Sequence, residues 1–189
     1  LVPLLVTLPL LGAAVALVFG RNKRVQVAVS VLVLATTTVL AGILLVTVDQ
    51  SQPIAVSVGA WPLPFGIVLY VDRLAALLVL VTSIVLIAVL LFSIGQGAAD
   101  NDEDTPVSIF YPSYLILAAG IYNAFIAGDL FNLYVGFEIL LVASYVLITL
   151  GGTESRIRAG VVYIVVSLVS SILFLAAIAM IYAALGTVN

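Results

Sequence analysis

Cysteine and histidine are both absent from the 189 residues of the chain. Their absence excludes a disulfide framework, a thiol nucleophile, a Ser-His triad and any metal site built on these two residue types. Charge is scarce as well, since 8% of the residues are charged, against roughly 25% in a typical soluble domain. The net charge is −3 and no cluster of Lys and Arg marks a nucleic-acid surface. We therefore expect no cofactor, no bound metal and no nucleic-acid partner.

Most of the residues are apolar. They make up 65% of the chain, and the mean hydropathy is +1.38. The apolar runs are long enough to cross a bilayer repeatedly, because about 20 residues of helix span its hydrocarbon core. The sequence predicts an all-α polytopic membrane protein with one membrane domain and about six transmembrane helices. The expected helices are residues 1–20, 25–48, 72–95, 107–127, 129–150 and 159–185.

The few positive charges predict the orientation of these helices. Positive residues collect in cytoplasmic loops of membrane proteins. Five of them fall in two connections that we place inside, and Arg73 falls outside; the five are Arg21, Lys23, Arg24, Arg156 and Arg158. The N-terminus is then outside, as is loop 49–71, whose short alternating runs with Pro and Gly are typical of an extended or hairpin-like segment. The acidic loop 96–106 is cytoplasmic, and we assign it no chemistry.

Apart from Asp129 at its start, Glu138 is the single charged residue of an apolar stretch of helix length, GDLFNLYVGFEILLVASYVLITLGG. It lies about 13 Å from Asp129 along a helix, near the middle of a hydrocarbon core ~30 Å thick. An acid at a helix centre costs roughly 2.5 to 3.5 kcal/mol on insertion scales, so its presence favours a function. Burial disfavours the charged carboxylate and a nearby cation favours it, which makes proton relay the chemistry implied. A Glu held permanently by hydrogen bonds inside a helix bundle is the alternative.

Hydroxyl groups near Glu138 are candidates for a proton path. Tyr134 and Tyr145 are predicted to share the helix face of Glu138. In the following segment Ser167, Ser170 and Ser171 are spaced to share a face. We favour helix packing for these serines, but beside Glu138 they and Tyr163 could support a water wire.

Two aspartates stand where outer helix ends are predicted. Asp72 and Asp129 each precede an apolar run, which is typical of an N-cap. An ion pair to another helix is the alternative for Asp72, and a role in ion entry is the alternative for Asp129. Asp129 lies half a turn out of phase with Glu138, so the two carboxylates are not a catalytic pair.

The stretch Gly128 to Gly152 resembles the fifth membrane helix of the antiporter-like subunits shared by Mrp-type multisubunit cation/proton antiporters and respiratory complex I. Two further stretches favour the D subunit of the Mrp type within this family: VGAWPLPFGIVLYVDRLAALLVLVTS (Val58 to Ser83), and the end of the last segment, Tyr182 with Gly186 to Asn189. The resemblance covers essentially the whole chain. The chain corresponds to about the first two-fifths of a family member, so we expect it to be a fragment.

The resemblance implies a plasma-membrane complex of several membrane subunits that exchanges internal Na⁺ for external H⁺. It implies that Glu138 is a proton-translocation residue, and that its partner is a lysine on a seventh helix beyond Asn189. Some relatives have a lysine immediately before Tyr163, where this chain has Val162. The function expected is ion transport rather than enzymatic catalysis.

Two other functions remain open at this point. The first is a proton-pumping subunit of an NADH-quinone oxidoreductase or a membrane hydrogenase, in which other subunits would carry the electrons. The second is a membrane scaffold that transports nothing, in which Glu138 only specifies helix packing.

Overall fold

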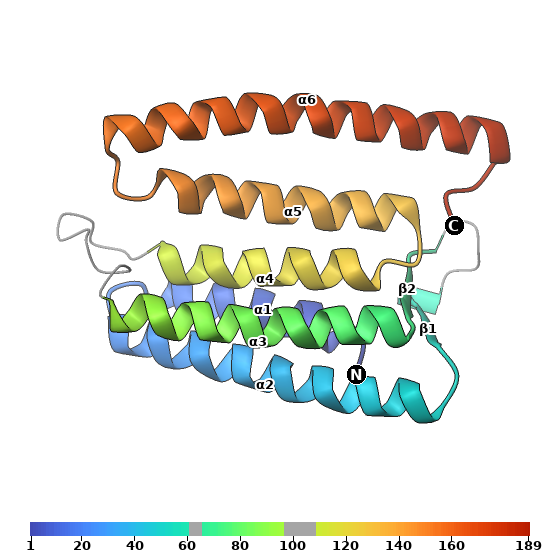
Figure 1. Ribbon diagram of the computed structural model, residues 1–189, viewed down its shortest axis with the longest axis horizontal. Helices are drawn as coiled ribbons and strands as arrows, with labels where there is room; N and C mark the ends of the chain where they lie inside the picture. Colours follow the sequence, from blue (N-terminus) through green and yellow to red (C-terminus); the bar gives the residue numbers. More distant parts are fainter. Residues whose placement is uncertain (61–65, 97–108) are drawn as a thin grey trace.

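The computed structural model describes residues 1–60, 66–96 and 109–189, and helices dominate it (Figure 1). Within these residues six α-helices run up and down the bundle, and a short hairpin lies at one of its ends. The helices are α1 (Leu4–Val18), α2 (Lys23–Gln50), α3 (Arg73–Gly95), α4 (Phe110–Ile126), α5 (Leu130–Thr149) and α6 (Glu154–Leu185). An all-α membrane architecture was predicted from the apolar runs, and it is confirmed.

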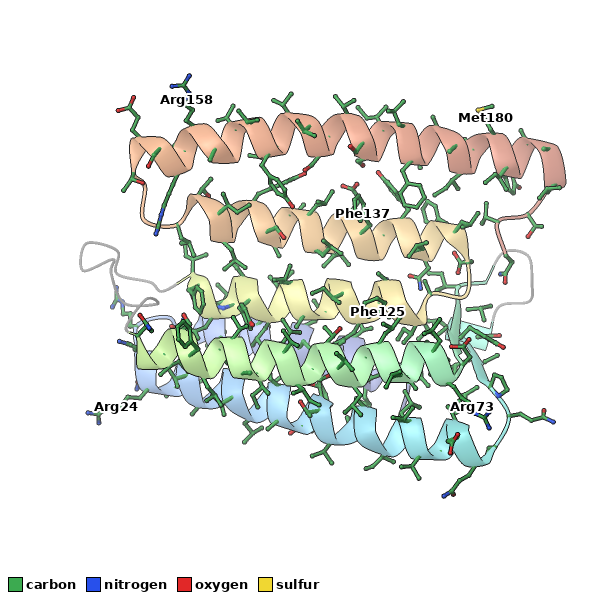
Figure 2. All side chains as sticks on the ribbon, in the orientation of Figure 1. Arg24, Arg73, Phe125, Phe137, Arg158 and Met180 are labelled. Carbon is green, nitrogen blue, oxygen red and sulfur yellow. The ribbon has the colours of Figure 1, made fainter. Side chains whose placement is uncertain are left out.

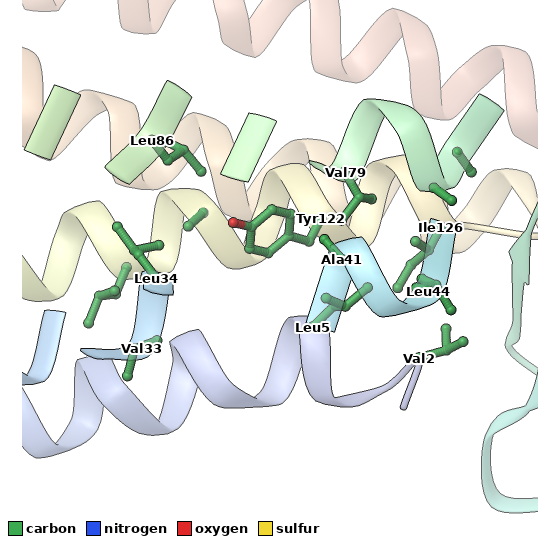
Figure 3. Packing of buried hydrophobic residues seen from close by; sticks show 14 of the residues in the cluster. Val2, Leu5, Val33, Leu34, Ala41, Leu44, Val79, Leu86, Tyr122 and Ile126 are labelled. Carbon is green, nitrogen blue, oxygen red and sulfur yellow. The ribbon is translucent and has the colours of Figure 1, made fainter. Parts of the chain in front are cut away.

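Helices α1 to α4 enclose the apolar core, and the last two helices are added to it one after the other. Helix α4 contacts α1, α2, α3 and α5, whereas α6 packs mainly against α5. Figure 1 shows α5 lying between α4 and α6. In the core, Tyr122 of α4 lies among Leu5 of α1, Leu34 and Leu44 of α2 and Val79 of α3 (Figure 3). One face of α5 therefore meets a packed bundle and the other meets a single helix.

In the part of the chain that the structure describes, four helices are long and apolar enough to cross a membrane, namely α2, α3, α5 and α6. Helices α1 and α4 are apolar but shorter, with 15 and 17 residues. At 1.5 Å per residue α4 is about 26 Å long, which is close to the thickness of a hydrocarbon core. Most of α4 is buried by its neighbours, so this helix need not present a full-length apolar surface to lipid. The chain is a multi-pass membrane protein.

The labelled arginines lie at the two ends of the bundle, as the predicted topology requires. Arg24 and Arg158 lie at one end and Arg73 at the other (Figure 2). The turn from α1 to α2 and the turn from α5 to α6 share the first end, opposite the hairpin (Figure 1). Arg73 pairs with Asp49, with 3.1 Å between Nε and Oδ1, and both side chains are about 70% exposed. An exposed pair of this kind contributes little to stability.

The predicted hairpin within loop 49–71 forms from β1 (Ile54–Ser57) and β2 (Val68–Val71), which pair antiparallel with Ile54 opposite Val71. The one-turn 3-10 helix η1 (Val58–Ala60) follows β1. Strand β2 also contacts the turn between α4 and α5 through a bridge from Leu69 to Ala127. The hairpin is thereby attached to the start of α5.

Helix α6 begins at Glu154, five residues earlier than the expected start at 159. Gly151 and Gly152 take positive φ angles of 85° and 56°, which allow a tight turn that other residues rarely adopt. Glu154 then lies in the first turn of α6, where a negative charge interacts favourably with the helix dipole. Arg156 donates a hydrogen bond to the Leu150 carbonyl at the end of α5, with 2.6 Å between Nη1 and O. The predicted acidic loop 96–106 lies, except for Gln96, outside the described residues.

Candidate functional site

Glu138 lies near the middle of α5 and is half-buried in this chain. Eight residues separate it from Leu130, so it is about 12 Å from the beginning of the helix. Its side chain points into the contact between α5 and α6, where the Ser171 hydroxyl donates a hydrogen bond to its Oε1 atom. Hydrogen bonds from hydroxyl groups stabilise a carboxylate at a depth where water cannot.

A second hydroxyl extends this contact. The Tyr134 hydroxyl oxygen lies 3.3 Å from Ser171 Oγ. Ser171 is 4% exposed and Tyr134 and Glu138 are half-buried, and the three groups form a short hydrogen-bonded series from phenol to serine to carboxyl. Each hydroxyl can both donate and accept a hydrogen bond, and such a chain can pass a proton to or from the carboxyl.

Aromatic rings pack beside the hydrogen-bonded groups of Tyr134, Ser171 and Glu138. Phe174 of α6 meets Tyr134 and Phe137 edge to face, at centroid distances of 5.9 and 6.0 Å. Figure 2 shows Phe137 on α5. The rings add apolar surface near the carboxyl group. Electrostatic interactions of a carboxyl group are stronger in apolar surroundings than in water, because the dielectric constant is lower.

On the other side of Glu138, Tyr145 and Tyr163 meet edge to face at 5.5 Å. Tyr163, Ser167 and Ser171 recur every four residues along α6 and lie on the face toward α5, where Ser167 is 8% exposed. The adjacency of this face to Glu138, which the sequence could not show, is present in the structure. Hydroxyl groups thus lie along the α5–α6 contact on both sides of Glu138.

Ser170 does not belong to this face, contrary to the expectation that all three serines share it. Its side chain is exposed, and its Oγ donates to the Val166 carbonyl of its own helix at 3.0 Å. One residue corresponds to a rotation of 100°, which turns Ser170 away from α5 while Ser171 faces it. Ser170 is therefore removed from the candidate proton path.

Both aspartates occupy N-cap positions. Asp72 accepts a hydrogen bond from the Ala75 amide at 2.7 Å, and Asp129 accepts one from the Asn132 amide at 2.6 Å. The second oxygen of Asp129 accepts the Val68 amide of β2 at 3.3 Å. Asp129 is 8% exposed and lies at the beginning of α5 beside the hairpin, away from Glu138. Within the described ranges, no three acidic side chains come together in a way that could hold a metal ion.

Two pairs of residues that the sequence did not single out join α5 to α4. Asn123 of α4 hydrogen-bonds to Asn132 of α5, and the helix backbones meet closely at Gly120 and Gly136. An asparagine within each of two consecutive apolar segments is a signal for interhelical hydrogen bonding. The glycines carry a weaker signal, because small residues allow close helix contact but do not identify the partner helix.

Known proteins resemble this chain in sequence and in structure. Residues 127–189, which include Glu138 and Ser171, match the family described as NADH:quinone oxidoreductase/Mrp antiporter, TM. The D subunit of the Na⁺/H⁺ antiporter of Bacillus subtilis is 40% identical over 97% of this chain and 36% of the relative. The corresponding D subunit of Alkalihalophilus pseudofirmus is 36% identical over 100% of this chain and 38% of the relative. The chain thus spans less than two-fifths of the length of these relatives.

Solved structures agree with the sequence matches. In the Mrp complex from Dietzia sp. DQ12-45-1b, a chain of 29% identity superposes with a TM-score of 0.92, over 100% of this chain and 35% of the other. In an archaeal membrane-bound sulfane sulfur reductase, a chain of 30% identity gives a TM-score of 0.89 over 100% of this chain and 38% of the other. In respiratory complex I from Thermus thermophilus, a chain of 25% identity gives 0.77 over 98% of this chain and 37% of the other.

The fold and the matches indicate the class first: the chain is similar to membrane subunits of the Mrp complex and of an archaeal respiratory membrane complex, and its last third matches the NADH:quinone oxidoreductase/Mrp antiporter family. Within that class, the two curated relatives described above are D subunits of Na⁺/H⁺ antiporters, with 40 and 36% identity over nearly the whole chain. The resemblance inferred from the sequence is confirmed.

Proposed function

We propose that this chain is the N-terminal part of a proton-translocating subunit in a multisubunit Na⁺/H⁺ antiporter of the plasma membrane, with Glu138 as an intramembrane proton relay. Other membrane subunits of the complex are its partners, and H⁺ and Na⁺ are the transported ions. The similarity to the D subunits of antiporters supports the class of activity. The observation that carries the proposal is the hydrogen bond that the Ser171 hydroxyl of α6 donates to the Glu138 carboxyl near the middle of α5.

In the proposed cycle Glu138 alternates between the protonated and the charged form. Ser171 donates a hydrogen bond to the carboxyl group. We propose that an additional electric field decides whether Glu138 holds or releases its proton, because a positive charge nearby favours a carboxylate. Tyr134 and Ser171 provide the hydroxyl chain through which the proton leaves or arrives.

That additional field requires a cation, and this chain does not place one beside Glu138. Its six Lys and Arg residues lie in the turns or near the helix ends: Arg21, Lys23, Arg24, Arg73, Arg156 and Arg158. We therefore propose that the cation comes from another segment of the longer protein, in agreement with the lysine that the family resemblance implies. Approach or neutralisation of that cation would load and unload Glu138.

The test is Glu138→Gln in the full-length subunit within the complete complex. Glutamine keeps the size and the hydrogen-bonding ability of the side chain but cannot carry a proton. In everted membrane vesicles with a pH-sensitive dye, we expect normal assembly with loss of Na⁺-dependent proton exchange. Glu154→Gln, at the exposed start of α6, is the matched control and should exchange normally. Retained exchange in Glu138→Gln would show that Glu138 is not the relay and would favour the scaffold function.

One observation favours a second candidate. The similarity to a chain of the archaeal sulfane sulfur reductase, at a TM-score of 0.89, is nearly as high as that to the Mrp complex. The same relay could therefore serve a respiratory complex in which other subunits carry electrons. The neighbouring genes separate the candidates: small Mrp-like membrane subunits favour the antiporter, whereas iron–sulfur and flavin subunits favour the respiratory complex.

A further inference from the structure

The face of α5 opposite the Glu138 side chain packs directly against α4. A helix turns by 100° per residue, so Gly136 and Leu140, each two residues from Glu138, lie on that opposite face. Gly120 of α4 meets both of them. A Cβ atom added at Gly120 would lie 2.6 Å from the Leu140 nitrogen and 3.0 Å from the Gly136 oxygen. The two helix backbones are therefore in contact at the depth of the carboxyl.

Gly136 makes the same contact from the other side. A Cβ atom there would lie 2.8 Å from the Ala124 nitrogen and 3.0 Å from Asn123 Nδ2. The nearest obstacle is again main chain, which cannot move aside as a flexible side chain can. Any residue larger than glycine at position 120 or 136 must push α5 away from α4. Because α6 lies beyond α5 (Figure 1), the displacement is in the direction of Ser171.

A polar contact fixes α5 further toward the outer end. Asn123 Nδ2 donates to the Asn132 carbonyl at 3.2 Å and to its side-chain Oδ1 at 3.1 Å. The Asn132 amide in turn donates to Asp129, and all three residues are less than 9% exposed. Buried hydrogen bonds of this kind resist rotation and sliding of one helix along another, because breaking them leaves polar groups without partners.

The contact on the front of Glu138 is of a different kind. There α5 meets α6 through long side chains, the Tyr134, Phe137 and Phe174 rings and the Glu138–Ser171 hydrogen bond. Rings and a carboxyl can change rotamer without moving the main chain, whereas touching backbones cannot adjust. The main chain that carries Glu138 is thus fixed from α4.

We propose that Gly120, Gly136 and the Asn123–Asn132 pair are positioning residues that set the distance and direction from Glu138 to Ser171. This inference rests on the proposed function of Glu138 as the relay. The α4–α5 contact is then the fixed support of the carboxyl, and proton transfer involves side-chain rearrangement at the α5–α6 contact.

Gly136→Ala and Gly120→Ala in the complete complex test the inference. We expect the Na⁺-dependent proton exchange per assembled complex to fall by at least about tenfold, because small misplacements of a reacting group have large effects on rate. Gly42→Ala is the matched control, since Gly42 lies within α2 and a Cβ added there meets nothing within 4 Å. Its exchange should be unchanged.

A third variant decides the matter if the alanine variants fail to assemble. Asn123→Ala removes both hydrogen bonds to Asn132 without adding bulk, and we expect it to lower exchange several-fold in assembled complexes. Normal exchange by an assembled Gly136→Ala, Gly120→Ala or Asn123→Ala complex would overturn the inference. If Glu138→Gln itself retained exchange, the proposed function would fail first, so the two failures are distinguishable.

An infrared measurement separates positioning from a loss of folded protein. The carboxyl C=O stretching band that is lost in Glu138→Gln belongs to Glu138. In the best-assembled of the three variants this band should shift in frequency, because the hydrogen bond from Ser171 changes. A band that only weakens in proportion to the amount of complex, without a shift, would indicate a purely structural role and overturn the inference.

Discussion

Glu138 depends on one hydroxyl from another helix. The hydrogen bond from Ser171 is made to a group that can be charged, and such bonds are worth about 1.5 to 3 kcal/mol. Ser171→Ala should therefore lower proton exchange about tenfold or more, measured in vesicles and normalised to assembled complex. Alanine removes only the hydroxyl oxygen, so the packing of α6 on α5 is retained.

Ser170→Ala is the control for this change. The two serines are adjacent and chemically identical, but Ser170 is exposed and bonds to its own helix. Its replacement should leave exchange unaltered. Equal losses in both variants would mean that serine content or helix stability, rather than the contact with Glu138, limits exchange.

At the level of single residues, the sequence singled out Glu138 but not the serine that donates a hydrogen bond to it. The depth of Glu138 follows from counting residues along an apolar helix, which needs no tertiary information. Ser171 could not be chosen over Ser170, because three serines at spacings of three and four residues allow more than one facing direction. Asn132 was overlooked because its role depends on Asn123, nine residues earlier and across a turn.

Asp129 fixes the beginning of α5 through two hydrogen bonds. Asp129 caps it through the Asn132 amide and also accepts the Val68 amide of the hairpin. Asp129→Ala removes the cap, at about 1 kcal/mol, and leaves a strand amide without its acceptor, at about 1 to 3 kcal/mol more. The variant should unfold at a lower temperature and be cut faster by protease near the turn between α4 and α5.

Asp72→Ala offers the comparison. Asp72 caps α3 through the Ala75 amide, so its loss should cost about 1 kcal/mol and less than the loss of Asp129. Asp129→Asn, which keeps a capping oxygen, should recover most of the stability. A larger effect at Asp72 than at Asp129 would contradict the proposed link between the hairpin and α5.

The sequence predicted the helices and the hairpin better than it predicted how closely neighbouring helices pack. Apolar runs and capping residues place helices, and alternating residues with Pro and Gly place the hairpin. The early start of α6 was missed because its first turn is polar, with Glu154, Arg156 and Arg158 exposed at the bundle end. The contact at Gly120 and Gly136 could not be predicted from composition, since Gly42 also lies in an apolar helix and a Cβ added there would meet nothing within 4 Å.

Considered as a whole, the bundle has two chemically distinct ends. One carries Arg24 and Arg158, and the other carries the hairpin and Arg73 (Figure 2). Both cytoplasmic connections that the positive charges predict fall at the first end, although they are more than a hundred residues apart in the sequence. The distribution of charge and the path of the helices thus support the same orientation.

The absence of cysteine makes this orientation measurable. Single cysteines can be introduced into the full-length subunit at Ser57, exposed in the hairpin, and at Ser155, exposed at the start of α6. A membrane-impermeant maleimide applied to intact cells should label Ser57→Cys, since the hairpin is predicted to be outside. Ser155→Cys should react only after the cells are permeabilised. The unmodified subunit, recognised by its size, supplies the background, because any reactive thiol beyond Asn189 or in a partner would label there too. The reverse pattern would place Arg24 and Arg158 outside and invert the predicted topology.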